Sequence, residues 1–188
     1  MDVKQAIFER RAHRSLAPVE TGEDLIRDLA ESAQLAPSCF NNQPWRYVFV
    51  HDRGLLETLC SALSSGNRWA TAASMMIAVC SKRDLDCVVT DREYYLFDTG
   101  MATAFIILRA TELGLLAHPT AGFNEEKAKE ALEIPQDMKL ITLVVVGRHS
   151  EMITPLLSDE QADIEKRRPE RRPIEAFAFE NRFGAGSD

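Results

Sequence analysis

The chain has 188 residues, which suits one domain of ordinary size with a real core and leaves no room for a second large domain. Its net charge of −7 and its pI of about 5.2 argue against broad affinity for nucleic acids or anionic membranes, because both bind positive surfaces. We therefore expect neither kind of partner. Any basic binding site must be local.

The four cysteines give no sign of a metal site, since they form no CxxC pair and have no nearby histidine at a zinc-like spacing. Cys60 and Cys80 lie in apolar periodic segments, which predicts small buried side chains, whereas Cys39 lies in a polar loop. The N-terminus carries no signal-peptide core, and no segment approaches about 18 consecutive apolar residues. We expect a reduced, soluble, cytoplasmic chain.

The first half of the chain alternates helical and strand patterns. A short amphipathic helix is predicted from Val3 to about Arg11 or Arg14. The patterns that follow predict a helix from Thr21 to Ala33 with a capping box, a strand from Trp45 to His51, a helix over Leu55 to Leu63 capped by Asp52, and a buried strand from Met75 to Cys80.

The second half contains the longest helical pattern, from Asp91 to Leu113, with Gly114 placed as its left-handed C-cap. Three more elements are predicted: a short helix from Asn124 to Leu132, a buried strand from Leu140 to Val146, and a capped helix from Ser158 to Arg168. Helices and strands mix without strict alternation, which favours an α+β sandwich.

Residues 150–188 are predicted to extend a single domain that spans residues 1–188. This segment carries Phe177, Phe179 and Phe183 but little secondary-structure pattern. We expect such a tail to pack on a partner chain, because it would otherwise expose its aromatic rings. The alternative is a tail that packs on its own domain.

The N-terminal arginines Arg10, Arg11 and Arg14 form a local basic cluster around Ala12. Planar guanidinium groups pair with phosphate oxygens bidentately, so the cluster suits a phosphorylated ligand. If the helix continues that far, Arg10 and Arg14 project from one face. The alternative is that these cations only complement the helix dipole.

A polar segment rich in amides, Ala36 to Tyr47, lies between a helical pattern and a strand, where an enzyme would place a ligand-binding loop. Its side chains include Ser38, Cys39 and Asn41 after Pro37. Asn41 offers both donor and acceptor groups. Alternatively, Ser38 and Asn41 only close a turn before the strand.

The two motifs, in this order and about thirty residues apart, resemble those of the nitroreductase family, whose members usually read RRSxR and then APSSxNxQPW. The resemblance implies that Arg10, Arg11, Ala12 and Arg14 bind the phosphate and ribityl chain of flavin mononucleotide (FMN). Ala12 replaces the usual serine. It also implies that Pro37, Ser38, Cys39 and Asn41 reach the same flavin from the partner subunit, with Cys39 replacing the second serine.

Two later segments are similar to the same family. Residues 114–123 match a loop ending in PxEGF or PxxGF, which implies that Pro119, Ala121 and Gly122 lie at the flavin and that a backbone amide there reaches flavin N5. Gly122 would permit close approach and unusual dihedral angles. Ala121 stands where many relatives have glutamate. His118 is interpreted as a structural residue, and Asn67 and Trp69 as either pocket or core residues.

The segment from Pro169 to Glu175 is similar to a stretch by which relatives return a basic residue to the phosphate, with Arg171 as the best match and Arg172 as the fallback. A solvated charge run is the alternative. The fold that the resemblance implies is an α/β/α sandwich with a mixed, mainly antiparallel sheet around a long central helix, built as a homodimer.

The function that the resemblance implies is hydride transfer from NADH or NADPH to FMN and then, by ping-pong kinetics, to a small acceptor such as a nitroaromatic or a quinone. No side chain is required as catalytic acid or base, because the flavin carries the chemistry. Two alternatives are different chemistry on the same flavin fold, namely dehalogenation or flavin breakdown, and a flavin-binding protein without enzymatic activity.

Overall fold

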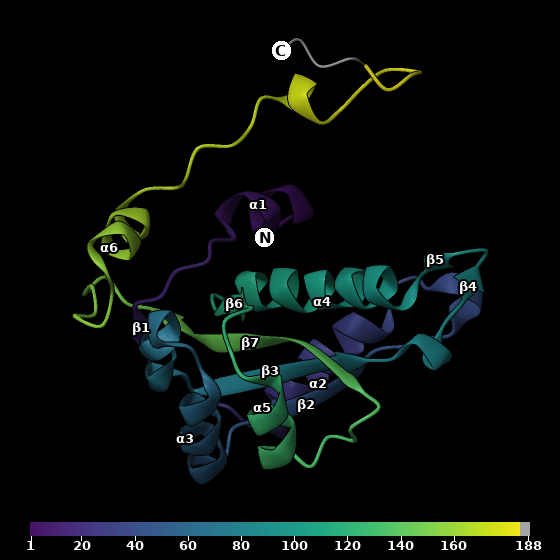
Figure 1. Ribbon diagram of the computed structural model, residues 1–188. Helices are drawn as coiled ribbons and strands as arrows, with labels where there is room; N and C mark the ends of the chain where they lie inside the picture. Colours follow the sequence, from purple (N-terminus) through teal and green to yellow (C-terminus); the bar gives the residue numbers. More distant parts are fainter. Residues whose placement is uncertain (185–188) are drawn as a thin grey trace.

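The computed structural model describes residues 1–184 (Figure 1). Its α-helices are α1 (Val3–Glu9), α2 (Glu23–Gln34), α3 (Arg53–Ala62), α4 (Tyr95–Glu112), α5 (Glu125–Ala131) and α6 (Asp159–Lys166). Its strands are β1 (Leu16–Ala17), β2 (Arg46–Val50), β3 (Met75–Ser81), β4 (Val88–Val89), β5 (Arg92–Glu93), β6 (Leu116–Thr120) and β7 (Lys139–His149). Short 3-10 turns include η1 (Cys39–Asn41), η2 (Ser65–Ala72) and η4 (Ile174–Ala176).

The sheet is built around β7 and β3, which lie at its centre. The strand order is β1-β7-β3-β2, with β6 also paired to β7, and every pairing within residues 1–184 is antiparallel. The expected α+β fold is therefore confirmed, and its sheet, expected to be mixed and mainly antiparallel, has antiparallel pairings throughout these residues. A separate hairpin joins β4 and β5.

Helices cover both faces of this sheet, as the side-chain alternation of β3 requires. Met76, Ala78 and Cys80 point into a core shared with α3, η2 and α5. Met75, Ile77 and Val79 point into the opposite core, shared with α2 and α4. The continuous apolar run in the sequence thus reflects burial on both faces, and Figure 1 shows α4 on one side of the sheet and α3 and α5 on the other.

Several helix boundaries follow directly from local chemistry. The side chains of Asp52, Asn124 and Ser158 accept hydrogen bonds from backbone amides in the first turns of α3, α5 and α6, and Ser158 forms a full capping box with Gln161. Gly114, with φ of 71°, ends α4 in the left-handed region. These predicted ends are confirmed.

Three other predicted boundaries are wrong. Helix α1 already ends at Glu9, so Arg10 and Arg14 do not share a helical face. Residue 22, a glycine, precedes α2 without a side-chain cap, in place of the predicted capping box at Thr21. Residues 92–93 belong to the β4–β5 hairpin, which delays the start of α4 to Tyr95.

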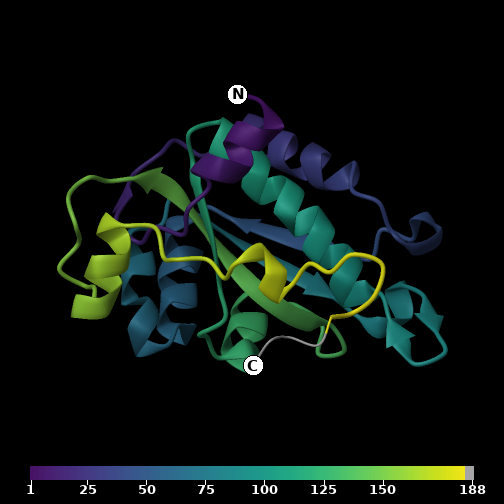
Figure 2. The same cartoon turned by 90° about the horizontal axis from the view of Figure 1, so that it is seen from above.

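The C-terminal segment after α6 runs along the α4 side of the molecule and stands away from the body (Figure 1), crossing above α4 when seen from above (Figure 2). Phe177 and Phe183 are exposed, and Phe183 contacts the Phe179 ring with centroids 4.6 Å apart. Residues 185–188, the end of the predicted extension, lie outside the described residues. Within residues 1–184, no helix has the length and apolar character to cross a membrane.

The central strand offers a test of the fold. Leu143 of β7 is fully buried, so Leu143→Ala should lower the free energy of unfolding by about 2–5 kcal/mol, from lost burial and the cavity left behind. Leu55→Ala, on the exposed side of α3, should change it by about 0.5 kcal/mol. Equilibrium denaturation by urea measures both, and equal losses would contradict this assignment of the core.

Candidate functional site

Arginines from both ends of the chain meet at one cavity. The segment after α1 supplies Arg10, Arg11 and Arg14, and the segment after α6 supplies Arg168 and Arg171; we call these five residues the arginine cluster. The cavity that they line has a volume of about 220 Å³, and Ala12, Ile164 and Pro169 complete its wall. The predicted convergence of Arg171 with the N-terminal arginines is therefore present in the structure. Arg172 does not line this cavity.

A buried carboxylate brings the two chain ends together. Glu165 of α6 accepts hydrogen bonds from the backbone amides of Arg14 (3.0 and 3.1 Å) and Ser15 (2.9 Å). These amides and the nearby His13 lower the pKa of Glu165 against the opposing effect of its burial. The carboxylate is therefore ionised when α6 is docked, which makes the hydrogen bonds charge-assisted.

Two arginines of the cluster are committed to holding its backbone in place. Arg11 Nη2 donates to the carbonyls of Ile164 (2.9 Å) and Glu165 (3.3 Å) in the last turn of α6. Arg168 donates to the carbonyls of Phe8 and Arg10 and lies over the Phe8 ring. Each guanidinium thus meets free carbonyls at or near a helix C-terminus, which are natural partners for a cation. Arg11, which was predicted to bind the ligand, therefore also has a structural role.

The remaining arginines are available for a ligand. Within the described residues, Arg14 Nη1 is buried and has no hydrogen-bond partner, although buried donors are nearly always paired. The pKa of Arg10 is lowered by burial and then by the charges of Arg168 and Arg171. An uncompensated group of cations with an unpaired buried donor is suited to a multivalent anion such as a phosphate.

Two histidines pack beside Glu165 and complete the contact between the chain ends. The rings of His13 and His149 stack with centroids 3.7 Å apart, and each has a nitrogen near Glu165 Oε1, at 3.5 and 3.7 Å. Because the two rings are stacked and nearly parallel, the lone pairs in their planes lie side by side. They do not point toward one position that an ion could occupy. We therefore assign this cluster to the docking of α6. Burial, with His149 and Arg11, lowers the pKa of His13 to about 4.

The segment predicted as a flavin loop begins as a strand, β6, that sequence patterns missed. His118 is buried in it, and its Nδ1 lies 2.9 Å from the His13 carbonyl oxygen, which agrees with a structural role. Burial lowers its pKa. Trp69 packs 4.6 Å from the His118 ring and belongs to the core. Strand β6 therefore lies directly against the segment that carries Arg14.

Asn67 holds the turn after β6. Its Nδ2 donates to Thr120 Oγ1 (2.6 Å) and to the Gly122 carbonyl (2.9 Å). A Cβ at residue 122 would overlap Asn67 Nδ2 and Ser64 Oγ, which explains the glycine by close approach. The predicted unusual dihedral angle is wrong, because among residues 1–184 only Gly114 is a glycine with positive φ. Pro119 and Ala121 are exposed beside this turn.

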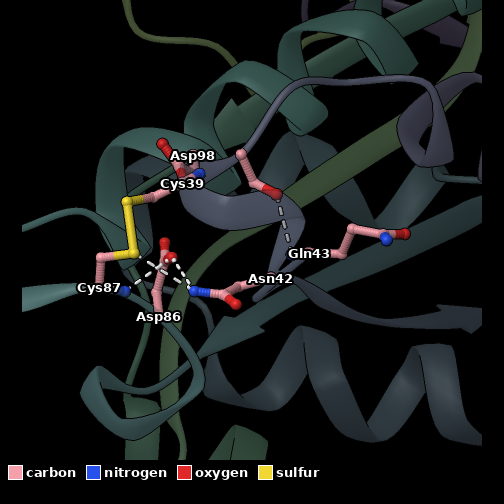
Figure 3. The surroundings of a disulfide bond; sticks show 7 residues. Cys39, Asn42, Gln43, Asp86, Cys87 and Asp98 are labelled. Carbon is pink, nitrogen blue, oxygen red and sulfur yellow. Dashed lines mark hydrogen bonds between the residues drawn. A yellow bond between two sulfur atoms is a disulfide. The ribbon is translucent and has the colours of Figure 1, made fainter.

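The amide-rich loop, residues 37–43, is attached at another place. Cys39 forms a disulfide with Cys87, and its amide donates to Asp98 Oδ2 at 2.6 Å (Figure 3). This corrects the expectation of a fully reduced chain; Cys60 and Cys80 carry free thiols. Ser38 Oγ accepts from the Gln43 amide at 2.9 Å, as a turn-forming residue would, while the exposed Asn41 has a positive φ of 58°.

The arginine cluster and the 37–43 loop lie at opposite ends of α4. Asp98, which binds Cys39, is in the first turn of α4, whereas Thr111 at the other end lines a cavity with Arg10 and Arg11. Positions 98 and 111 are 13 steps apart along the helix, so at a rise of about 1.5 Å per residue the two ends are about 20 Å apart. One chain therefore presents two separate groups of candidate site residues.

Comparison with known proteins identifies the family of the chain. The sequence profile of the nitroreductase family matches residues 7–148. The chain belongs to the nitroreductase family. An uncharacterized 15.4 kDa protein from Mycolicibacterium smegmatis is 34% identical over 128 residues, which cover 68% of this chain and 83% of that protein.

Further relatives of this nitroreductase carry descriptive names or solved structures. A candidate NADH dehydrogenase/NAD(P)H nitroreductase from Archaeoglobus fulgidus is 29% identical, with 75% of this chain and 82% of that protein covered. A crystal structure described as an oxidoreductase containing FMN has a TM-score of 0.82 and 28% identity, over 98% of this chain and 94% of that one. A nitroreductase family protein from Clostridium novyi has a TM-score of 0.75 and 26% identity, over 80% and 87% of the two chains.

Sequence reasoning missed three residues that organise the candidate site. Arg168 lies three positions before Arg171 and could have been found from that spacing around Pro169. Glu165 gave no signal, because a single glutamate in a helix is usually exposed. Cys87 lies 48 positions from Cys39, and pairing over such a separation is not encoded in any local pattern.

The docking of α6 should be sensitive to acid. Because the folded pKa of His13 is lowered from 6.5 to about 4, the unfolded chain binds a proton first, and this contribution to stability is lost as the pH falls from 6.5 to 4. The lowered pKa of Glu165 adds a further loss as the pH falls below 4.5. Limited proteolysis after α6 and chemical denaturation across this range measure the effect.

A ring that cannot titrate provides the control for this prediction. His13→Phe keeps an aromatic ring for stacking on His149 and should flatten the pH dependence between 6.5 and 4. His51→Phe, at an exposed position, should retain the dependence of the unmodified chain. An unchanged slope in His13→Phe would contradict the assignment.

Proposed function

We propose that the chain is an FMN-dependent oxidoreductase that passes hydride from NADH or NADPH through the flavin to a small acceptor, such as a nitroaromatic or a quinone, by ping-pong kinetics. The observation that carries the proposal is the meeting of arginines from both chain ends at one cavity, where Arg14 Nη1 is buried without a partner. A phosphate group would supply the missing acceptor and balance the charge. The FMN in a structural relative with 28% identity supports the choice of ligand.

Different groups of residues would contact different parts of the FMN. Arg10, Arg14 and Arg171 would bind the phosphate, with Ala12 beside them, because Arg11 and Arg168 also hold the backbone. The turn at Pro119, Ala121 and Gly122, fixed by Asn67, would lie at the ring. Pro37, Ser38, Cys39 and Asn41 would contact the same ring from a second copy of the chain.

The protein's part in the reaction is to bind and orient. When bound, the flavin supplies the acceptance and donation of hydride. A backbone N–H of the turn after β6 would donate to the ring at N5, and Asn67 holds that turn rigid through two hydrogen bonds. Ala121 provides no carboxylate there, so the chain itself brings no acid or base to this position. A nicotinamide donor also favours the cytoplasm as the working compartment.

A homodimer follows from the two separate groups of candidate site residues. The arginine cluster and the 37–43 loop are about 20 Å apart along α4, so one flavin touches both most readily where two copies meet. The α4 side of the molecule also exposes Phe8, Phe97, Phe105 and Phe177, an apolar surface of the kind that partner chains cover. The C-terminal extension would then pack on the partner.

The first test is the spectrum of the purified protein. We expect a yellow dimer with one FMN per subunit and a flavin absorbance band that bleaches within the stopped-flow time range when NADH or NADPH is added without oxygen. Addition of a nitroaromatic or quinone should restore the band. A colourless monomer that takes up no added FMN would refute the proposal.

Neighbouring arginines give a matched test of the phosphate site. Arg171 lines the cavity and Arg172 does not, although both are exposed and adjacent. Arg171→Ala should weaken FMN binding about tenfold, as expected for one lost hydrogen bond to a charged group. Arg172→Ala should leave the dissociation constant within a factor of about two. Fluorescence titration with FMN measures both, and equal effects would remove Arg171 from the phosphate site.

A further inference from the structure

Two residues of the 37–43 loop, Phe40 and Gln43, adopt a left-handed backbone conformation that their side chains disfavour, beside Asn41, which tolerates it. Phe40, Asn41 and Gln43 all have positive φ, at 48°, 58° and 48°. None is glycine, and Phe40 is a bulky residue with an exposed side chain. Such left-handed residues persist only where surrounding contacts over-determine them. Hydrogen bonds within the loop, such as that from the Gln43 amide to Ser38 Oγ, hold part of this conformation, and contacts outside the loop add to them.

The contacts from outside the loop come from one neighbouring segment and the start of α4 (Figure 3). The exposed Asn42 side chain donates from Nδ2 to Asp86 Oδ1 and to Cys87 Sγ, both at 3.3 Å, and the first of these is a long N–H···O bond. The Cys39 amide donates to Asp98 Oδ2 at 2.6 Å. The covalent constraint among them is the Cys39–Cys87 disulfide, which crosslinks residues 48 positions apart.

The disulfide is placed where its state can change. Cys39 and Cys87 are both partly exposed, so a small reductant can reach the sulfur atoms. Asp86 and Asp98 lie beside the pair, and carboxylates disfavour a thiolate. Once opened, the cysteines are therefore poor nucleophiles, and their state follows the redox reagents around them. In a reducing compartment, disulfides of this kind are characteristically transient and redox-sensing.

We propose that the Cys39–Cys87 disulfide is a reversible redox modification site, addressed by dithiol reductants, that holds the 37–43 loop in its ligand-binding conformation. The inference rests on the proposed function, because the ligand it controls is the FMN reached by this loop. In the oxidised state the strained loop is locked and FMN is retained. In the reduced state the loop relaxes and FMN binds more weakly.

The chemical step is ordinary thiol–disulfide exchange. A thiolate of the dithiol attacks Cys87 Sγ, forms a mixed disulfide and releases Cys39 as a thiolate, which takes a proton from solvent. The second thiol group of the reductant, as a thiolate, then attacks the reductant's other sulfur atom, which is bonded to Cys87 Sγ in the mixed disulfide. Cys87 leaves and takes up a proton to become a thiol. Two electrons pass to the protein, and the reductant leaves as a cyclic disulfide.

Two measurements on the full chain test the proposal, with dithiothreitol as the dithiol. Mass spectrometry of thiol-alkylated protein should find Cys39 and Cys87 joined after mild oxidation and free after reduction. On reduction, hydrogen exchange of the amides in residues 38–43 should speed up about tenfold, and the dissociation constant of FMN should rise about tenfold.

Two serine variants separate this disulfide from general effects of the reductant. Cys87→Ser, outside the loop, should match the reduced protein and no longer respond to dithiothreitol. Cys60→Ser removes a free thiol and should retain the full response. Cys39 joined to Cys87 with loop exchange unchanged on reduction would overturn the inference, as would thiols that never join under oxidation.

The proposed function can fail separately. If neither redox state binds FMN, the proposed function is wrong, and exchange in residues 38–43 still decides whether the disulfide controls the loop. If FMN binds equally in both states, the proposed function stands and the inference is overturned.

Discussion

The structure depends on one buried carboxylate, which joins the two ends of the chain through hydrogen bonds. Glu165, buried in α6, accepts hydrogen bonds from the amides of Arg14 and Ser15, and Arg11 returns a guanidinium to the last turn of α6. A buried carboxylate is costly unless it is fully hydrogen-bonded, so this contact forms in one geometry or not at all. That geometry brings Arg10, Arg14 and Arg171 to a common cavity.

The same contact explains why so many cations can be placed together. Repulsion among five arginines would disperse an isolated cluster. Here Arg11 and Arg168 are each offset by backbone carbonyls, those of Ile164 and Glu165 for Arg11 and those of Phe8 and Arg10 for Arg168. The repulsion that remains falls on Arg10, which lies near the charges of Arg168 and Arg171, and an anionic ligand would relieve it. In the proposed function, a phosphate would balance these charges, so the cluster costs fold stability that the bound ligand would restore.

The length of helix α4 sets the distance between the arginine cluster and the 37–43 loop. The helix holds the arginine cluster near its C-terminus and the 37–43 loop at its first turn, so the two groups of residues cannot merge within one chain. The two groups are also stabilised differently. The arginine cluster depends on a buried charge, whereas the loop depends on a crosslink and a few exposed hydrogen bonds. The first is sensitive to pH and the second to redox state.

The sequence by itself determined what is local. Side-chain caps at Asp52, Asn124 and Ser158, the left-handed stop at Gly114 and the apolar run of β3 each act within a few residues, so their positions could be predicted. The arginine and amide motifs could be found for the same reason, since their residue types and order carry the chemistry.

Only the tertiary structure decided which distant segments those residues contact. Strand β6 is short and interrupted by Pro119, and it becomes a strand only because β7 pairs with it. The early end of α1, the role of Glu165 and the partner of Cys39 each depend on a segment at least 48 positions away. Such contacts are set by the packing of the whole chain, and no local pattern of residues encodes them.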